Sequence, residues 1–155
     1  MHSKLRRAAE FKAGRSRAGF TLLEMVVTLL IIAVLATVAV PSYSDYLIRG
    51  RLQAGVGVLK SSRERLEQSY SDNRSYAAAD GSCAMAPFTD SDSGFAYACS
   101  LAAGGQQFTL TATGTGPVAG FRFAIDEAGI ERTLIVRVGW SSAPLPVNRF
   151  IVRKE

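Results

Sequence analysis

The chain has 155 residues, enough for one modest domain and an anchor, and carries a net charge of +5 at pH 7. Of the 18 basic and 13 acidic residues, six basic and one acidic precede Gly19, so the rest of the chain has twelve of each sign. The basic character is therefore confined to the leader, and it does not indicate that the rest of the chain binds nucleic acid. The only histidine is His2, so the rest lacks the commonest general base and metal ligand, and we expect no catalytic site, metal or cofactor there.

Residues 1–19 form a basic leader directly ahead of an apolar run. By the positive-inside rule, such a leader stays in the cytoplasm and the chain beyond the apolar run is exported. A basic arm can also bind anionic lipid or nucleic acid, but its position beside an apolar segment favours the topological role. The basic residues of the leader are Lys4, Arg6, Arg7, Lys12, Arg15 and Arg17.

The segment from Phe20 to Val40 is apolar over 21 residues, and about 20 residues span the core of a bilayer as a helix. We therefore predict a membrane helix over residues 20–41. Glu24 is the exception, because a charged side chain inside a bilayer costs roughly 2.5–3.5 kcal/mol on insertion scales. A secretory signal would have a shorter apolar region that ends at a small-residue cleavage site. A plain single-pass anchor is the stronger alternative, but it gives no reason to keep the carboxylate.

Pro41 interrupts the helical pattern. Proline removes a backbone donor and crowds the preceding turn, so we expect a kink there rather than an end. Residues 42–76 are predicted to continue the helix in amphipathic form, to about residue 72. Arg63 occupies one position of the apolar stripe. The other positions are Leu52, Val56, Leu59, Leu66 and Tyr70.

Residues 77–155 form the predicted exported region, which begins with a loop over residues 77–94. After it, apolar residues recur at every second position, which indicates half-buried strands. The runs lie at residues 95–101, 108–113, 121–126 and 134–138, the last with Leu134, Val136 and Val138 facing inward, and Phe150 to Val152 form a further short candidate strand. The apolar stripe of the helix is the available cover for these strands. We therefore predict an α+β fold, with a long N-terminal helix packed on a four-stranded antiparallel sheet.

Gly19 followed by Phe20-Thr21-Leu22-Leu23-Glu24, between a basic leader and an apolar helix, resembles the class III signal of type IV prepilins. Later segments resemble PilE-like minor pilins of the type IV pilin and pseudopilin superfamily. These segments are Pro41 to Tyr46, Leu66 to Tyr76, Phe108 to Gly114 and Ala119 to Phe121. The resemblance implies the type IV pilin fold and a structural protein rather than an enzyme.

The resemblance also implies how the N-terminal residues are used. Prepilin peptidase would cut after Gly19 on the cytoplasmic face and N-methylate the new amino terminus of Phe20. Glycine suits the cleaved position because a side chain would obstruct close approach to the backbone. Glu24 would pair with the N-terminal ammonium of a neighbouring subunit, which neutralises two charges that are costly in lipid. The implied partners are other major and minor pilins, the peptidase and the inner-membrane pilus assembly machinery.

The same resemblance implies a bacterial inner-membrane precursor that becomes a minor pilin of a surface pilus, or fimbrium, with roles in pilus biogenesis, adhesion and twitching motility. A type II secretion pseudopilin is one alternative, since the N-terminal motif does not separate the two. A pilin that captures DNA for uptake is another, and it would need basic side chains gathered on one face. The available side chains are Arg122, Arg132, Arg137, Arg149, Arg153 and Lys154.

Cys83 and Cys99 lie in the region predicted to be exported, where an oxidising compartment permits a disulfide. The bond would close a loop of about 17 residues and contribute on the order of 3 kcal/mol in the chain-entropy model. Because Cys99 falls on the apolar face of its strand, a buried free thiol is the alternative. We expect the disulfide, which would tie the loop after the helix to the first strand.

Overall fold

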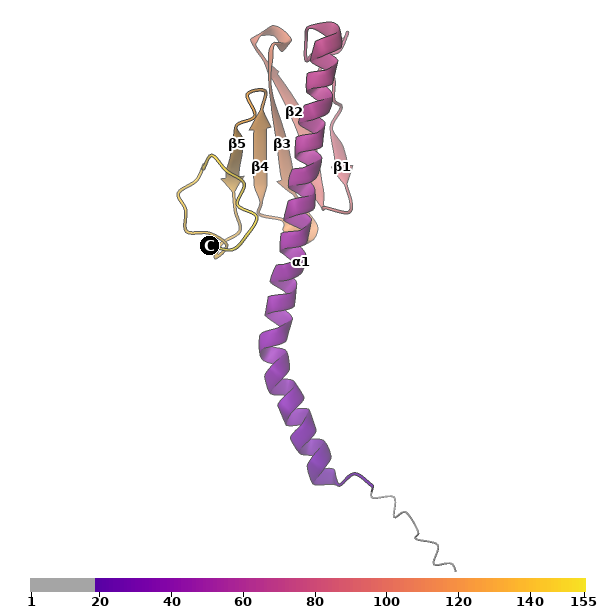
Figure 1. Cartoon of the computed structure of the whole chain (residues 1–155), viewed down its shortest axis with the longest axis vertical. Coiled ribbons are helices and arrows are strands. Elements are labelled where there is room, and N and C mark those ends of the chain that lie inside the picture. The colour runs from indigo at the N-terminus through magenta and orange to yellow at the C-terminus, as the bar shows by residue number, and fades with distance from the viewer. Residues whose placement is uncertain (1–18) are drawn as a thin grey trace, which may run out of the picture. The chain divides into compact units, whose positions relative to one another are not determined.

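The computed structural model describes residues 19–155, so the predicted leader lies outside the described residues up to residue 18. Within the described part, helix α1 runs from Leu22 to Asn73 and is followed by five strands and two short 3₁₀ turns (Figure 1). The elements after α1 are β1 (Phe88–Asp90), β2 (Phe95–Ala102), η1 (Ala103–Gly105), β3 (Gln107–Gly114), η2 (Gly116–Val118), β4 (Arg122–Asp126) and β5 (Glu131–Ile135). The chain divides into two compact units, one ending at Val40 and one spanning Pro41–Glu155.

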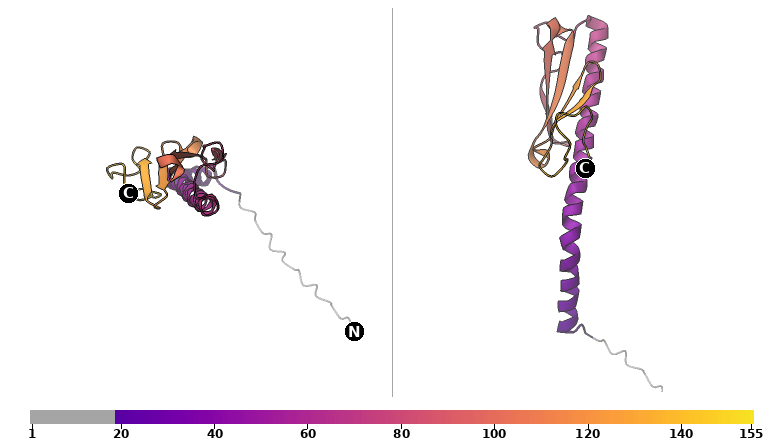
Figure 2. Two further views of the ribbon diagram at one scale, coloured as in Figure 1. Left: turned by 90° about the horizontal axis from the view of Figure 1, so that it is seen from above. Right: turned by 90° about the vertical axis from the view of Figure 1, so that its left-hand side faces the viewer.

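Within the second unit, α1 lies along one face of the sheet (Figure 2). One stripe of the helix is buried against the strands, as its spacing predicts. The buried residues of the stripe are Leu52, Gly55, Leu59, Ser62 and Leu66. Arg63 is only half-buried, because its guanidinium reaches the turn after β4 and donates to the carbonyls of Asp126 and Glu127 at 3.2 and 2.8 Å. The charged residue within the stripe thus links the helix to the turn between β4 and β5.

The sheet is an antiparallel meander in the order β1-β2-β3-β4-β5, so the prediction of four strands was wrong by one. The additional strand, β1, lies inside the segment predicted to be a loop. Its three residues are too few to show a period of two. Pairing with β2 holds it in place, with Phe88 opposite Tyr97 and their rings stacked 4.7 Å apart.

The last strand was predicted with the wrong inward face. β5 ends at Ile135 and its buried side chain is Thr133, whereas Val138 lies beyond the strand and is fully exposed. The threonine can be buried because its hydroxyl is satisfied. Its Oγ1 donates to the carbonyl of Arg149 at 2.6 Å and accepts from the amide of Ile151 at 2.9 Å. Apolar alternation cannot anticipate a buried hydroxyl whose partners come from the distant tail.

The strand predicted at residues 150–152 is absent from the described structure, and this tail packs as irregular chain instead. Ile151 is buried, and the ring of Phe150 meets Phe123 of β4 edge-on at 5.6 Å. Lys60 of α1 places its ammonium 5.6 Å from the centre of the same Phe150 ring. The tail therefore covers part of the apolar face of the sheet beside α1.

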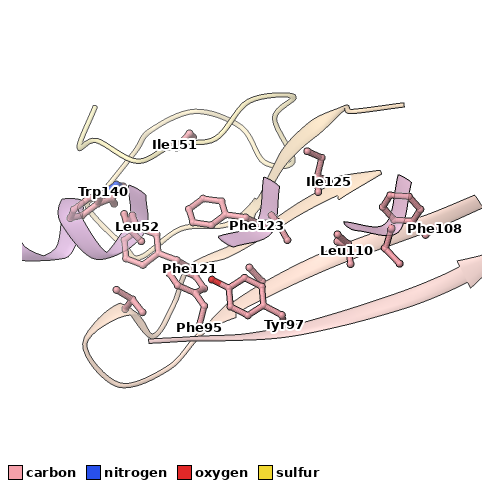
Figure 3. Packing of buried hydrophobic residues seen from close by; sticks show 14 of the residues in the cluster. Leu52, Phe95, Tyr97, Phe108, Leu110, Phe121, Phe123, Ile125, Trp140 and Ile151 are labelled. Atoms are coloured by element: carbon pink, nitrogen blue, oxygen red, sulfur yellow. The ribbon is translucent and has the colours of Figure 1, made fainter. Parts of the chain in front are cut away.

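Aromatic rings dominate the core between α1, the tail and the sheet (Figure 3). Phe121 meets Trp140 edge-on at 5.0 Å, and Phe95 lies 5.8 Å from Phe123. The alternation predicted for β2 and β3 is confirmed, because their inward residues are buried or half-buried. In β4 the inward Phe123 and Ile125 are buried, but Ala124 and Asp126, predicted to face outward, are buried too. Trp140 is the only tryptophan of the chain and is 3% exposed, so its fluorescence reports on the packing of this core.

Gly55 lies where α1 packs tightly against the sheet. A Cβ atom at this position would lie 2.5 Å from Cδ2 of Phe95, well inside the contact distance of two carbon atoms. The hydroxyl of Tyr97 also donates to the Gly55 carbonyl at 3.0 Å. Burial raises the pKa of Tyr97, so the phenol keeps the proton that it donates. A glycine that weakens the isolated helix is therefore required by the packing.

Cys83 and Cys99 are joined by a disulfide, as the sequence led us to expect. The bond ties the segment after α1 to β2, and Cys83 also forms an isolated bridge with Ala77. Both sulfur-bearing residues are half-buried against the edge of the core. The disulfide thus anchors a stretch that has little regular structure of its own.

Replacing Gly55 by alanine is expected to lower the free energy of unfolding by about 1–3 kcal/mol, because the added methyl group overpacks against the buried Phe95 ring. The matched control is Gly57→Ala, where no atom lies within 4 Å of the added Cβ. There, alanine is expected to stabilise the protein by about 0.5–1 kcal/mol through helix propensity. Urea unfolding followed by Trp140 fluorescence measures both changes, and equal effects at the two positions would contradict the tight packing at Gly55.

Replacing both Cys83 and Cys99 by alanine is expected to lower the free energy of unfolding by on the order of 3 kcal/mol, because the unfolded chain regains its freedom. A thiol reductant should destabilise the wild-type protein by a similar amount and leave the double variant unaffected. Urea unfolding with and without reductant makes the comparison. A double variant as stable as the oxidised wild type would show that the bond does not constrain the fold.

Candidate functional site

The first unit presents an apolar helical surface that no other described residue covers. From Gly19 to Val40 every residue is exposed, including Phe20 at 78% and Leu22 at 82%. By length and composition, α1 is apolar enough in this part to cross a membrane. Exposed apolar surface on this scale indicates contact with lipid or with another protein.

The start of α1 is capped by Thr21. Its hydroxyl oxygen accepts a hydrogen bond from the amide of Glu24 at 3.2 Å, which satisfies one of the free donors of the first turn. Glu24 lies in this first turn, where a carboxylate also interacts favourably with the positive end of the helix dipole. Thr-x-x-Glu is the capping-box pattern, a sequence signal that predicts both the helix start and the position of this carboxylate.

Two further polar side chains of the segment are satisfied within the helix. The hydroxyl of Thr28 donates to the carbonyl of Met25 at 2.9 Å, and that of Thr37 donates to Val34 at 2.7 Å. Glu24, by contrast, forms no ion pair with any residue in the described part of the chain. The segment therefore carries one carboxylate that needs an outside partner if the helix is placed in lipid.

Pro41 lies within α1, and the helix continues through it to Asn73. The predicted continuation of the helix beyond the proline is therefore confirmed. The kink expected at Pro41 concerns the junction of the two units and stays a prediction.

Most of the basic side chains considered for nucleic-acid contact are already engaged. Arg132 forms an ion pair with Asp126 at 2.8 Å, and Arg149 forms one with Glu155 at 2.7 Å. Lys154 forms an ion pair with Asp45 of α1 at 3.5 Å. Arg137 donates to two carbonyls of the β3–β4 connection at 2.6 and 3.0 Å. Arg122 is exposed and forms no ion pair with residues 19–155. The fold thus neutralises much of the charge that the sequence offers.

Arg153 lines a groove together with Arg49 and Arg51 of α1. The groove has a volume of about 440 Å³. Its remaining lining residues are Tyr46, Leu47, Gly50 and Gln53. None of the three arginines forms an ion pair with another described residue. Sequence reasoning missed this cluster because the tail meets α1 only in the folded chain.

Two acidic residues of the second unit stabilise turns of the sheet. Hydrogen bonds from the side chain and the backbone amide of Ser93 lower the pKa of Asp90, which closes the turn between β1 and β2. Asp126 accepts from the amide of Ile130 at 2.8 Å in the turn after β4. Among the described residues, no group of three or more histidine, cysteine or carboxylate side chains could hold a metal ion.

A long N-terminal helix with an exposed apolar half, followed by a half packed on an antiparallel sheet, is the type IV pilin fold. Two family models match the chain. The prokaryotic N-terminal methylation motif matches residues 14–40, and the family described as type IV minor pilin ComP, DNA uptake sequence receptor, matches residues 41–122. The second match covers more than half of the sequence, and the chain belongs to this type IV minor pilin family.

Curated relatives are also pilus proteins. The type IV major fimbrial protein FimA of Dichelobacter nodosus is 35% identical over 54 residues, which are 35% of this chain and 34% of FimA. Fimbrial protein EcpC of Eikenella corrodens is 26% identical over 95 residues, 61% of each chain. The chain thus spans about a third of the length of FimA, and less than two thirds of EcpC.

Proposed function

We propose that this chain is a minor structural subunit of a type IV pilus and that it polymerises through its N-terminal helix. The observation that carries the proposal is the exposed apolar segment with Glu24, whose carboxylate forms no ion pair with any of residues 19–155. Prepilin peptidase cuts after Gly19 and methylates Phe20, whose ammonium group then pairs with Glu24 of a neighbouring subunit. Both charges are costly in lipid, and each is a suitable counter-ion for the other.

The cap at the start of α1 supports this role for Glu24. Thr21 engages the backbone amide of Glu24 and leaves its carboxylate available to another subunit. The hydroxyl groups of Thr28 and Thr37 are bonded within the helix and do not compete for the ammonium group. Docking of two subunits therefore neutralises the charges that would otherwise oppose their burial.

In this proposal, residues 1–19 are the leader, 20–41 the membrane and polymerisation helix, 42–76 its amphipathic continuation and 77–155 the exported loop and sheet. The precursor crosses the inner membrane once, with its leader in the cytoplasm. The assembly machinery then transfers the mature chain to the pilus, where it supports pilus biogenesis, adhesion and twitching motility and carries no enzymatic activity. The match to a minor-pilin family favours a pilus over a type II secretion pseudopilin.

The variant Glu24→Ala is expected to insert and be processed normally but to enter filaments poorly, because the ammonium group of its neighbour loses its counter-ion. Mass spectrometry of purified filaments measures its abundance and shows whether the chain begins at methylated Phe20. Thr28→Ala is the matched control, since its hydroxyl bonds only within its own helix, and it is expected to assemble normally. Normal incorporation of Glu24→Ala would contradict the ion pair, and absence of the wild type from filaments would contradict the proposed function.

DNA uptake is a second candidate function, favoured by the description of the matched family as a DNA uptake sequence receptor. If the protein has this function, the processed chain in detergent is expected to bind a DNA duplex with an affinity that falls steeply between about 50 and 200 mM salt. Arg122→Gln is expected to reduce the salt slope by about one, because it removes an exposed cation that has no ion-pair partner among residues 19–155. Binding that is absent at low salt would exclude this function.

A further inference from the structure

Helix α1 begins two residues after Phe20, whose amide belongs to the peptide bond that the proposed processing cuts. Gly19, Phe20 and Thr21 lie outside the helix, which starts at Leu22. Among residues 19–155, no backbone hydrogen bond reaches the carbonyl of Gly19 or that of Phe20. Both residues are exposed, and a Cβ atom at Gly19 would meet no described atom within 4 Å. In the described part of the chain, the bond between them is therefore engaged neither by secondary structure nor by packing.

The hydroxyl of Thr21 sets where the helix begins. In a helix that continued upstream, each amide would donate to the carbonyl four residues earlier, so Glu24 would donate to Phe20. In the structure, the amide of Glu24 donates to Oγ1 of Thr21 at 3.2 Å instead. The carbonyl of Thr21 accepts the first helical hydrogen bond, from the amide of Met25 at 3.2 Å. Thr21 thus takes the donor that would hold the Phe20 carbonyl in a longer helix.

The residue types around this bond favour the same helix start. Glycine is a poor helix former, and a β-branched threonine loses side-chain freedom inside a helix. One more turn upstream would place both Gly19 and Thr21 inside the helix. It would also join the Gly19 carbonyl to the amide of Leu23. The cap and the helix propensities therefore both keep the Gly19–Phe20 bond non-helical.

Hydrolysis of this bond requires access to the carbonyl of Gly19. Water adds to the carbonyl carbon, the bond to the Phe20 nitrogen breaks, and the products are the Gly19 carboxylate and the Phe20 ammonium group. Donors of the peptidase have to stabilise the negative charge that develops on the carbonyl oxygen, and a carbonyl inside a helix is already engaged. Exposed backbone without internal hydrogen bonds is where proteolysis concentrates. The conformation ahead of Leu22 is thus the one that cleavage needs.

We propose that Thr21 is a positioning residue for prepilin processing, because its cap keeps the Gly19–Phe20 bond outside α1 in the form that the peptidase binds. The inference rests on the proposed function for the cleavage site. Thr21 acts through the conformation of the substrate and not by contact with the reacting atoms. Without the cap, part of the precursor population extends its helix across the bond and is not cleaved until the helix opens.

The test uses the full-length precursor in non-ionic detergent with purified prepilin peptidase. Mass spectrometry gives the initial rate of cleavage over a range of precursor concentrations. Thr21→Val keeps the shape of the side chain and removes the hydroxyl acceptor, whereas Thr21→Ser keeps the hydroxyl. Thr28→Val is the matched control, since the Thr28 hydroxyl donates to the Met25 carbonyl within the helix. Carbon chemical shifts of isotope-labelled Phe20 report whether that residue is helical.

Thr21→Val is expected to raise KM by about fivefold, the factor that a typical N-cap contributes, because fewer precursor molecules are in the competent form. It is expected to leave kcat nearly unchanged, since the bound form is the same. The Phe20 shifts should move toward helical values in this variant alone. Thr21→Ser and Thr28→Val are expected to match the wild type in both kinetic constants.

An unchanged KM for Thr21→Val would overturn the inference, and so would a Thr21→Ser variant that is impaired to the same degree. A lower kcat with an unchanged KM would overturn it too, because that result indicates contact between Thr21 and the peptidase in the transition state. A wild-type precursor that is not cut after Gly19 would instead contradict the proposed function. The two failures are therefore distinguishable in one set of rates.

Discussion

The apolar face of the sheet has to be kept from water, and the buried stripe of α1 provides most of its cover. The helix comes so close that Gly55 has no room for a side chain against Phe95, and its carbonyl receives the hydroxyl of Tyr97. This contact sets the register of the helix on the strands. Arg63 and Lys60 follow on the flank of the buried stripe, from which Arg63 reaches the turn after β4 and Lys60 meets the tail.

The two parts of α1 differ in how their apolar side chains are arranged around the helix. In residues 41–73 the apolar side chains form one stripe, so a single sheet buries them and the opposite face stays polar. In residues 20–40 the side chains are apolar all round, and only lipid or neighbouring helices can cover such a surface. A carboxylate there is tolerated only with a partner, which is why Glu24 connects membrane insertion with assembly in the proposed function.

Charge in the second unit is distributed by the fold rather than by local sequence. Neighbouring carboxylates neutralise Arg132 and Arg149, and backbone carbonyls hold Arg137. Arg49 and Arg153 keep free guanidinium groups because the tail packs beside α1 without bringing a carboxylate into ion-pair distance of either among the described residues. A chain that is neutral beyond its leader can thus carry a strongly basic groove.

Local patterns in the sequence were sufficient to predict much of the fold. The three- and four-residue spacing of α1 and the alternation of β2 and β3 depend on neighbours a few residues away, so they are visible without a structure. The motif from Gly19 to Glu24 is local in the same sense, and the family match supports the pilin interpretation that it suggested. The disulfide was expected from cysteine content and compartment, and the structure contains it.

The sequence by itself therefore determined the helix, the central strands and the N-terminal motif. Tertiary structure decided the features that depend on contacts between distant segments. β1 is too short to carry a period and exists through its pairing with β2. Thr133 is buried because the tail satisfies its hydroxyl, and Gly55 is needed because Phe95 lies against it. The arginine groove forms only where the tail meets α1, since no periodicity links residues so far apart in the chain.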